Sequence, residues 1–315
     1  MITNLVILIV VVAITIGLAL LTYRAVRARR WWVKIAGGLP AALLTLLLAY
    51  VSYMGIKGMA TLYFTGVGPA PDMTVEGTPE QVARGQYLVN IACTGCHGVQ
   101  GQFPLAGGLD LAADIPFPVG RAVSSNLTPG GPLADYSDGE LFRALRHSVD
   151  KNGDLFGFMA FMPYHQLSDD DLKAIIAYLR SETAVQTDHP NGDSFNFLGV
   201  LIFGADLYPL LKGEEGVITA PPAGPTAEYG EYVATFGECR GCHGPEMLGA
   251  PATVIAGEVP NPRPFVASIS VEQFIQTMRT GVRPDGSPLQ MPWLNAAKMN
   301  DEDLTALYIY LTTAP

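Results

Sequence analysis

The stretch Cys-Thr-Gly-Cys-His at residues 93–97 decides the fold of this chain, and a second copy, Cys-Arg-Gly-Cys-His, stands at residues 239–243. All 4 cysteines of the 315 residues lie in these two stretches. The pattern Cys-x-x-Cys-His is typical of covalent c-type haem attachment, in which two thiols form thioethers and the adjacent histidine ligates the iron. The sequence therefore predicts two covalently bound haem c groups, attached at Cys93, Cys96, Cys239 and Cys242.

Two other chemistries also use paired cysteines. A four-thiolate zinc site usually has its pairs ~15–20 residues apart, whereas 142 residues separate Cys96 from Cys239. A thioredoxin-like redox pair needs a βαβ setting, which neither flank offers. The histidine that follows each second cysteine favours haem over both, and it makes His97 and His243 the first axial ligands of the two irons.

The second axial ligand of each iron is expected to be a methionine. Met162 and Met291 each precede a proline, which keeps the methionine on an extended loop, and each stands just ahead of the last amphipathic helix of its repeat. Thioether ligation opposite histidine raises the reduction potential and favours electron transfer over chemistry at the iron. His165 is the rival ligand, whereas Met159 and Met299 are expected to be core residues.

Two uncharged runs near the N-terminus, at about residues 3–23 and 35–56, predict a transmembrane helical hairpin. The second run of 22 residues would extend roughly 33 Å, enough to cross a ~30 Å hydrocarbon core. A cleaved signal peptide is disfavoured, because no basic segment precedes the first run. The arginine-rich loop at residues 24–34 should stay in the cytoplasm. Both haem motifs then lie on the periplasmic side of a bacterial inner (cytoplasmic) membrane.

Charge is divided sharply along the chain. Residues 1–71 contain six Lys or Arg and no Asp or Glu, which leaves 13 basic and 29 acidic residues in the remainder. Such an acidic domain would attract a basic soluble electron carrier, although acidity also serves solubility alone. No nucleic-acid partner is expected.

From residue 85 onward the chain repeats itself in the same order. Gly-Gln-Tyr at 85–87 corresponds to Gly-Glu-Tyr at 230–232, and Met-Pro-Tyr at 162–164 corresponds to Met-Pro-Trp at 291–293. Apolar residues recur at i, i+3, i+4 and i+7 after each Met-Pro, as in an amphipathic helix. The predicted fold is all-α, with a hairpin at 1–64, a linker at 65–79, haem domains at 80–183 and 226–315, and an inter-domain segment at 184–225.

Three further groups of residues carry expectations. The apolar segment 195–211 is expected to pack between the haem domains, with a partner or membrane surface as the alternative. Aromatic side chains that could stack on the haem or bond its propionates are Tyr87, Tyr164, Tyr232 and Trp293. Arginines that could pair with propionates are Arg121, Arg143, Arg146 and Arg279.

From Gly85 to Pro315 each repeat resembles a class I cytochrome c domain: a Gly and an aromatic residue in the first helix, Cys-x-x-Cys-His, Met-Pro, and a final helix with an aromatic residue. The first repeat is similar to the cytochrome c subunits of membrane alcohol and gluconate dehydrogenases, which carry three haems and a different anchor. The layout of two helices and two haem domains resembles the dihaem subunit of the C-family haem-copper oxidases. These resemblances imply an all-α fold and a role in passing electrons singly between partners.

Two classes of function are compatible with these features. The first is a membrane-anchored dihaem cytochrome c that carries electrons within or between respiratory or photosynthetic complexes, as a subunit of a larger membrane complex. The second is a dihaem enzyme, such as a peroxidase or a thiosulfate dehydrogenase. An enzyme of that kind needs an open iron site, and the presence of a Met-Pro in both repeats argues against it.

Overall fold

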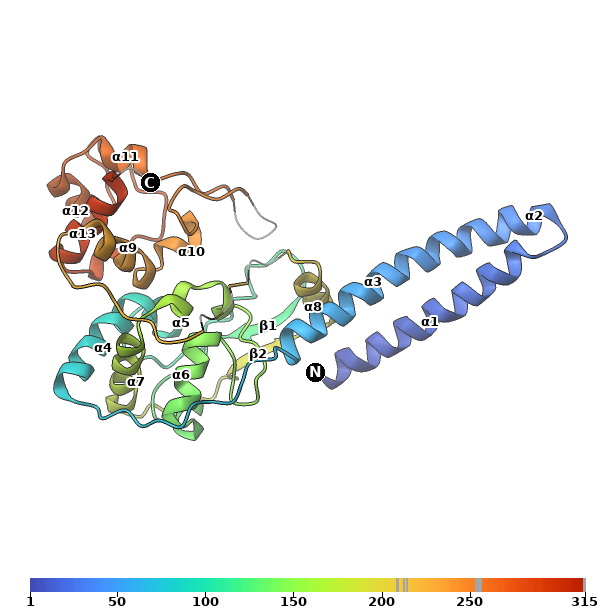
Figure 1. Ribbon diagram of the computed structural model, residues 1–315, viewed down its shortest axis with the longest axis horizontal. Coiled ribbons are helices and arrows are strands. Elements are labelled where there is room, and N and C mark those ends of the chain that lie inside the picture. Colours follow the sequence, from blue (N-terminus) through green and yellow to red (C-terminus); the bar gives the residue numbers. More distant parts are fainter. Residues whose placement is uncertain (208–209, 212, 214, 253–256, 314–315) are drawn as a thin grey trace.

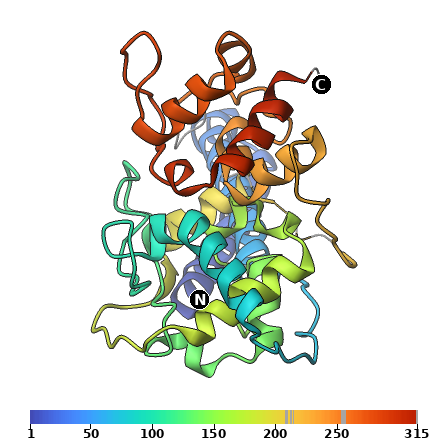
Figure 2. The same cartoon turned by 90° about the vertical axis from the view of Figure 1, so that its left-hand side faces the viewer.

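The computed structural model describes residues 1–207, 210–211, 213, 215–252 and 257–313. The chain forms a long helical hairpin and two helical domains, which lie together at one end of the hairpin (Figure 1). Turning the molecule by 90° shows the second domain beside the first, with the hairpin behind both (Figure 2). The predicted all-α class is confirmed, with one small two-stranded sheet in addition.

The hairpin consists of α1 (Ile2–Val26), the short α2 (Trp31–Val33), a π-helical stretch (Lys34–Gly38) and α3 (Leu39–Tyr63). Residues Ile2–Val26 and Trp31–Tyr63 are long and apolar enough to cross a membrane, with mean hydropathies of 3.1 and 1.9. The second helical run, Trp31–Tyr63, is longer than the expected span at residues 35–56, and it continues through Pro40 as that span required. The π-helical stretch stands immediately before that proline, and its wider turn accommodates the ring that would otherwise clash with the carbonyl four residues earlier.

The first haem domain is built on two crossing helices. It contains α4 (Pro79–Ala92), α5 (Thr94–His97), β1 (Gly120–Val123), α6 (Asp138–His147), α7 (Asp169–Ser181) and the 3-10 turns Pro132–Asp135, Met159–Phe161 and Pro163–Gln166. Helix α4 begins with a capping box at Thr78 and Gln81. Gly85 allows α4 to touch α7, since a Cβ there would lie 1.9 Å from the carbonyl oxygen of Ala174.

The second helical domain repeats this crossing. It contains α9 (Ala227–Phe236), α10 (Cys239–His243), α11 (Arg263–Ala267), α12 (Val271–Thr280), the 3-10 turn Ala296–Lys298 and α13 (Asp301–Thr312). A Cβ on Gly230 would lie 2.0 Å from the carbonyl oxygen of Ala306. The same glycine thus brings the first and last helices together in both domains.

The segment between the domains contains β2 (Gly192–Phe195) and α8 (Phe197–Gly204). Strand β2 pairs antiparallel with β1, with Gly120 opposite Phe195 and Val123 opposite Gly192. The side chain of Asn4 donates a 2.8 Å hydrogen bond to the carbonyl of Phe195. The sheet therefore attaches the first domain to the start of the hairpin.

The expected position of the apolar segment 195–211 was wrong, as far as the structure describes that segment; residues 208–209 lie outside the described part. Helix α8 packs on α3 of the hairpin (Figure 1) rather than between the haem domains. A Cβ on Gly58 would lie 1.9 Å from the carbonyl oxygen of Val200, and Phe203 belongs to the buried cluster at this junction. Lys57 and Asp206 form an ion pair at the edge of this contact. The small residues of α3 explain the contact, because they let the two helix backbones approach closely.

Replacing Gly204 with leucine should separate α8 from α3. A Cβ there would lie 1.9 Å from the carbonyl oxygen of Met54, a backbone atom that cannot turn away. Overpacking of this kind costs about 2 kcal/mol or more, so the midpoint of thermal unfolding in detergent should fall by several degrees. Gly17→Leu is the matched control, because a Cβ at Gly17 would contact nothing within 4 Å. Equal midpoints for the two variants would contradict the packing described above.

Candidate haem sites

The first haem site is organised around His97, which ends the short helix α5. Its Nδ1 lies 2.7 Å from the backbone carbonyl oxygen of Ser125. A carbonyl can only accept, so Nδ1 carries the proton and Nε2 keeps its lone pair for a metal. Burial lowers the pKa of His97, which keeps the ring in the neutral form that binds iron.

The second site repeats this geometry around His243. Its Nδ1 lies 3.0 Å from the backbone carbonyl oxygen of Pro260, and burial lowers its pKa as well. The carbonyl of each histidine also accepts a hydrogen bond from a glycine in the following loop, from Gly107 at 2.8 Å and from Gly249 at 2.9 Å. Both histidines are therefore held in the same way, as expected for a duplicated ligand.

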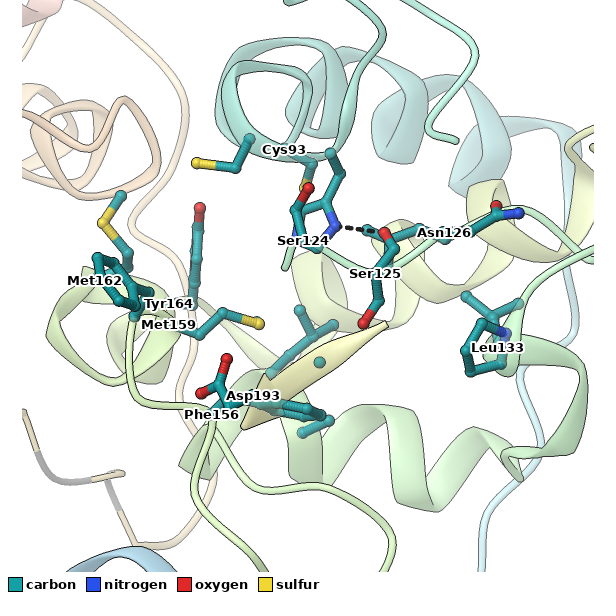
Figure 3. A pocket seen from close by; sticks show the side chains of 18 of the residues that line it. Cys93, Ser124, Ser125, Asn126, Leu133, Phe156, Met159, Met162, Tyr164 and Asp193 are labelled. Carbon is teal, nitrogen blue, oxygen red and sulfur yellow. Dashed lines mark hydrogen bonds between the residues drawn. The ribbon is translucent and has the colours of Figure 1, made fainter. Parts of the chain in front are cut away.

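A deep apolar cavity adjoins the first motif (Figure 3). Cys93, Cys96 and His97 line one wall of it. Aliphatic side chains from α6, α7 and the intervening loops line the rest: Leu127, Leu133, Leu141, Leu145, Ile175 and Leu179. Two thiols, a histidine with a free Nε2 and an apolar cavity are the donors and the environment that a covalently attached haem requires. The residues present fit the group.

Two methionines reach this cavity from the same loop. Met162 has an extended backbone (φ −82°, ψ 146°), as expected before a proline, and it lines the cavity. Its side chain is directed away from the centre, whereas the sulfur of Met159 points inward (Figure 3). The Met162 sulfur lies 3.9 Å from the position that a Cβ on Gly241 would occupy. Sequence reasoning placed Met159 in the core, and the structure places both sulfur atoms beside the cavity.

The rival ligand His165 is held in a structural role. Its Nδ1 contacts the carbonyl of Met162 at 3.3 Å, and its own carbonyl accepts a 2.6 Å hydrogen bond from Arg146. His165 is 7% exposed, and among the described residues it does not line the cavity. The geometry favours the methionines over this histidine.

Three of the arginines that could pair with propionates are each held by the polypeptide itself. Arg146 binds the carbonyls of His165 and Leu167 and the carboxylate of Asp169. Arg279 repeats this arrangement in the second domain, where it binds the carbonyl of Ala297 and the carboxylate of Asp301. Arg143 binds three backbone carbonyls, those of Gly68, Asp150 and Lys151. These arginines fasten the loops beside α6 and α12.

Asp193 is a cavity residue that sequence reasoning missed. It belongs to β2, opposite Ala122 of β1, and this pairing carries it to the cavity wall. Burial raises its pKa to about 6, although its carboxylate accepts a 2.6 Å hydrogen bond from the amide of Gly157. The strand pairing is a contact between segments about 70 residues apart, so no local pattern identifies this residue.

Glu238 is a buried carboxyl beside both haem motifs, one residue before Cys239. It accepts a hydrogen bond from the hydroxyl of Tyr164 of the first domain. Burial raises its pKa to about 7, while hydrogen bonds from Tyr164 and Asn295 and the charge of Lys298 act in the opposite direction. The carboxyl therefore binds a proton more tightly in the folded protein than in the unfolded chain.

This burial predicts a pH-dependent stability. With a folded pKa of about 7 against an ordinary value of 4.5, the stabilisation by Glu238 is complete below pH 4.5 and is lost as the pH rises through 7. The loss amounts to about 3 kcal/mol. The unfolding temperature of Glu238→Gln should therefore fall less between pH 5 and 8 than that of the wild type, because the variant lacks the contribution of Glu238. Parallel pH profiles for the two proteins would show that Glu238 is already ionised when folded.

Comparison with known proteins agrees with this site. Residues 82–183 match the family model described as Cytochrome c. The gluconate 2-dehydrogenase cytochrome c subunit of Pantoea cypripedii is 34% identical over 178 residues, which cover 53% of this chain and 38% of that protein. The fructose dehydrogenase cytochrome subunit of Gluconobacter japonicus is 28% identical over 265 residues, which cover 74% of this chain and 52% of that protein.

A third relative is the cytochrome c subunit of the quinone alcohol dehydrogenase of Gluconacetobacter polyoxogenes, which is 30% identical over 121 residues, 34% of this chain and 26% of that protein. The chain thus spans about half of the length of these relatives or less. The resemblance to dehydrogenase cytochrome c subunits is confirmed, and the family match lies on the first of the two domains. The chain therefore contains a cytochrome c domain, of the kind that binds haem c covalently, at residues 82–183.

Proposed function

We propose that this protein is a membrane-anchored dihaem cytochrome c that passes electrons as a subunit of a respiratory dehydrogenase complex. The observation that carries the proposal is the repeated ligand geometry: His97 and His243 each bind a backbone carbonyl through Nδ1 and keep Nε2 for iron. Each histidine is preceded by the two thiols that attach a haem and followed by a Met-Pro loop. Met162 and Met291 are the proposed second axial ligands.

The membrane anchor is supported by the helical hairpin. Both of its long helices are apolar and largely exposed to the surroundings of the protein. The arginine-rich loop lies at the far end of the hairpin from the haem domains (Figure 1). By the positive-inside rule that end faces the cytoplasm, so the haem domains face the periplasm.

The proposed electron donor is a dehydrogenase subunit, because three similar proteins are named as cytochrome subunits of gluconate, fructose and alcohol dehydrogenases. The haem domains hold the acidic residues of the chain. An acidic surface attracts a basic carrier, so a basic soluble protein is the proposed acceptor beside the membrane complex.

The proposal is tested on protein purified gently from membranes. Haem is measured per polypeptide, the spectrum is recorded with and without carbon monoxide, and the proteins that copurify are identified by mass spectrometry. We expect two low-spin haems, no carbon monoxide binding and a copurifying dehydrogenase subunit. A high-spin haem that binds carbon monoxide would favour a dihaem enzyme instead, and a single haem would exclude the dihaem assignment.

A further inference from the structure

The two haem domains share one hydrophobic core. A single cluster of buried side chains runs from Leu88 and Ile175 in the first domain to Val233 and Leu304 in the second. Phe236 of the second domain is fully buried and lies under the guanidinium of Arg84 and edge-on to the ring of Tyr87, both from the first. Domains that are merely tethered bury little surface against each other. These two are packed as one unit.

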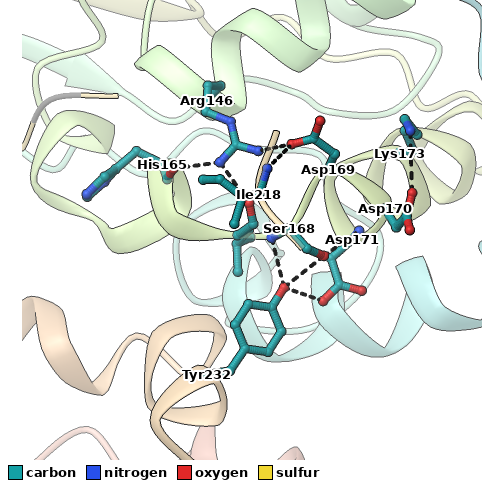
Figure 4. Close-up of polar contacts among 10 residues, drawn as sticks. Arg146, His165, Ser168, Asp169, Asp170, Asp171, Lys173, Ile218 and Tyr232 are labelled. Atoms are coloured by element: carbon teal, nitrogen blue, oxygen red, sulfur yellow. Dashed lines mark hydrogen bonds and ion pairs between the residues drawn. The ribbon is translucent and has the colours of Figure 1, made fainter. Parts of the chain in front are cut away.

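At one side of this interface, Tyr232 of α9 reaches the start of α7 in the first domain (Figure 4). Its hydroxyl accepts a 2.9 Å hydrogen bond from the amide of Ser168, the N-cap of α7, and donates a 2.6 Å bond to the carboxylate of Asp171. Tyr232, Ser168 and Asp171 are all less than 10% exposed. The contact is therefore shielded from water.

The other side of the interface shows the same contact in reverse. Tyr87 of α4 reaches the start of α13 in the second domain. Its hydroxyl accepts a 3.0 Å hydrogen bond from the amide of Asn300, the N-cap of α13, and donates a 2.5 Å bond to the carboxylate of Asp303, which is 3% exposed. Tyr87 and Tyr232 occupy equivalent positions in the two repeats. Each domain thus caps the last helix of the other.

The capping chemistry explains why a tyrosine from outside is needed. In a capping box a glutamate or glutamine at the third helical position reaches back to the amide of the N-cap residue. Here that position holds Asp171 in one helix and Asp303 in the other, and an aspartate is one methylene shorter. The tyrosine hydroxyl bridges the gap between the amide and the carboxylate. Each cap is complete only when the two domains are docked.

Docking also brings the two haem-attachment segments together. A Cβ on Gly95, inside the first motif, would lie 2.9 Å from the side-chain amide of Asn295 in the second domain. Gly241, inside the second motif, faces Pro163 and Met162 of the first domain. Tyr164 joins these elements, because its hydroxyl lies within hydrogen-bond distance of both the Glu238 carboxyl and the carbonyl oxygen of Ala92. Each haem-attachment motif therefore contacts the segment of the other domain that contains, or directly follows, its Met-Pro loop.

We propose that Tyr87 and Tyr232 are reciprocal interdomain clamps, and that they hold the two haem sites as one rigid relay across this interface. This inference rests on the proposed dihaem function. The clamps are positioning residues, since they touch neither iron ligand. The first domain is docked on the hairpin through α8 and β2, so the clamps also fix the second domain relative to the hairpin.

The test uses the full-length protein with Tyr87→Phe, Tyr232→Phe and the double substitution, which keep the rings and remove only the hydroxyls. Matched controls are Tyr178→Phe and Tyr308→Phe, whose hydroxyls bond within one domain, to the carboxylate of Glu182 and to the carbonyl of Ile269. The readouts are the split circular-dichroism signal of two interacting haems, the potential of each haem, and the number of calorimetric unfolding transitions.

A hydrogen bond to a carboxylate is worth roughly a ten- to hundredfold change in an equilibrium constant, so each single variant should weaken the split signal. The double variant should lose it and unfold in two transitions, with both potentials and the haem content unchanged. The controls should keep the signal and the single transition. A double variant with an undiminished signal, or a wild type without one, would overturn the clamp. If instead the wild type carries one haem, the proposed function itself fails, and the haem count separates these two failures.

Discussion

Substituting serine for Cys239 and Cys242 together should yield a protein with one haem per polypeptide instead of two. Both thiols are needed for two thioethers, and a serine hydroxyl forms neither. The remaining haem should be the one attached at the first motif, where Cys93 is buried and His97 is already held by the carbonyl of Ser125. The intact mass in denaturing acid and the absorbance of reduced haem per polypeptide measure the loss directly.

This result carries most weight for the second domain, because the family match ends at residue 183. The reciprocal variant, with serine at Cys93 and Cys96, is the matched control and should retain the second haem. It should also be the less stable of the two, since Cys93 belongs to the shared core and Cys242 is exposed. An unchanged haem content in the variant with serine at Cys239 and Cys242 would contradict the assignment of a second haem site, and the proposed relay would fail with it.

The sequence was sufficient for the parts of the site that depend on local pattern. The spacing of the two motifs, the Met-Pro steps and the amphipathic helices predicted the helical domains, in which His97 and His243 end two short helices. The helical hairpin was also predicted, since uncharged length alone identifies it. Its second helical run begins at Trp31 and ends at Tyr63, so it extends beyond both ends of the predicted span at residues 35–56.

The features that sequence reasoning did not predict depend on contacts between segments that are distant in the sequence. Composition could not show that α8 packs on α3, because an apolar stretch suits any apolar neighbour. The contact depends on Gly58 and Gly204, which let the two helix backbones approach closely. The sequence likewise could not show that Tyr87 and Tyr232 each cap a helix more than 60 residues away in the sequence. The sequence also could not show that Arg146 and Arg279 bind backbone carbonyls, because a charged side chain gives no sign of which carbonyl it will bind.

Replacing Met162 with histidine should lower the potential of the first haem by roughly 0.3 V, a fraction of the ~0.8 V over which axial ligands set haem potentials. The thioether ligand stabilises the reduced iron, and an imidazole in its place favours the oxidised state. The extended backbone before Pro163 supports Met162 as the ligand. The inward direction of the Met159 sulfur supports Met159 instead. Redox titration of the two haems, followed by the sulfur-to-iron band in the far red, separates these assignments.

Met159→Leu is the matched variant, because it removes the second sulfur from the same cavity and keeps an apolar side chain there. If Met162 is the ligand, Met159→Leu should keep both the band and the potential. A lost band in Met159→Leu with a normal band in Met162→His would transfer the ligand role to Met159. If His97 holds one face of the haem as proposed, Met159 and Met162 would be the candidates for the opposite ligand, because both residues line the cavity. In either case the potential of the second haem should change little, because Met291 belongs to a separate loop of the other domain.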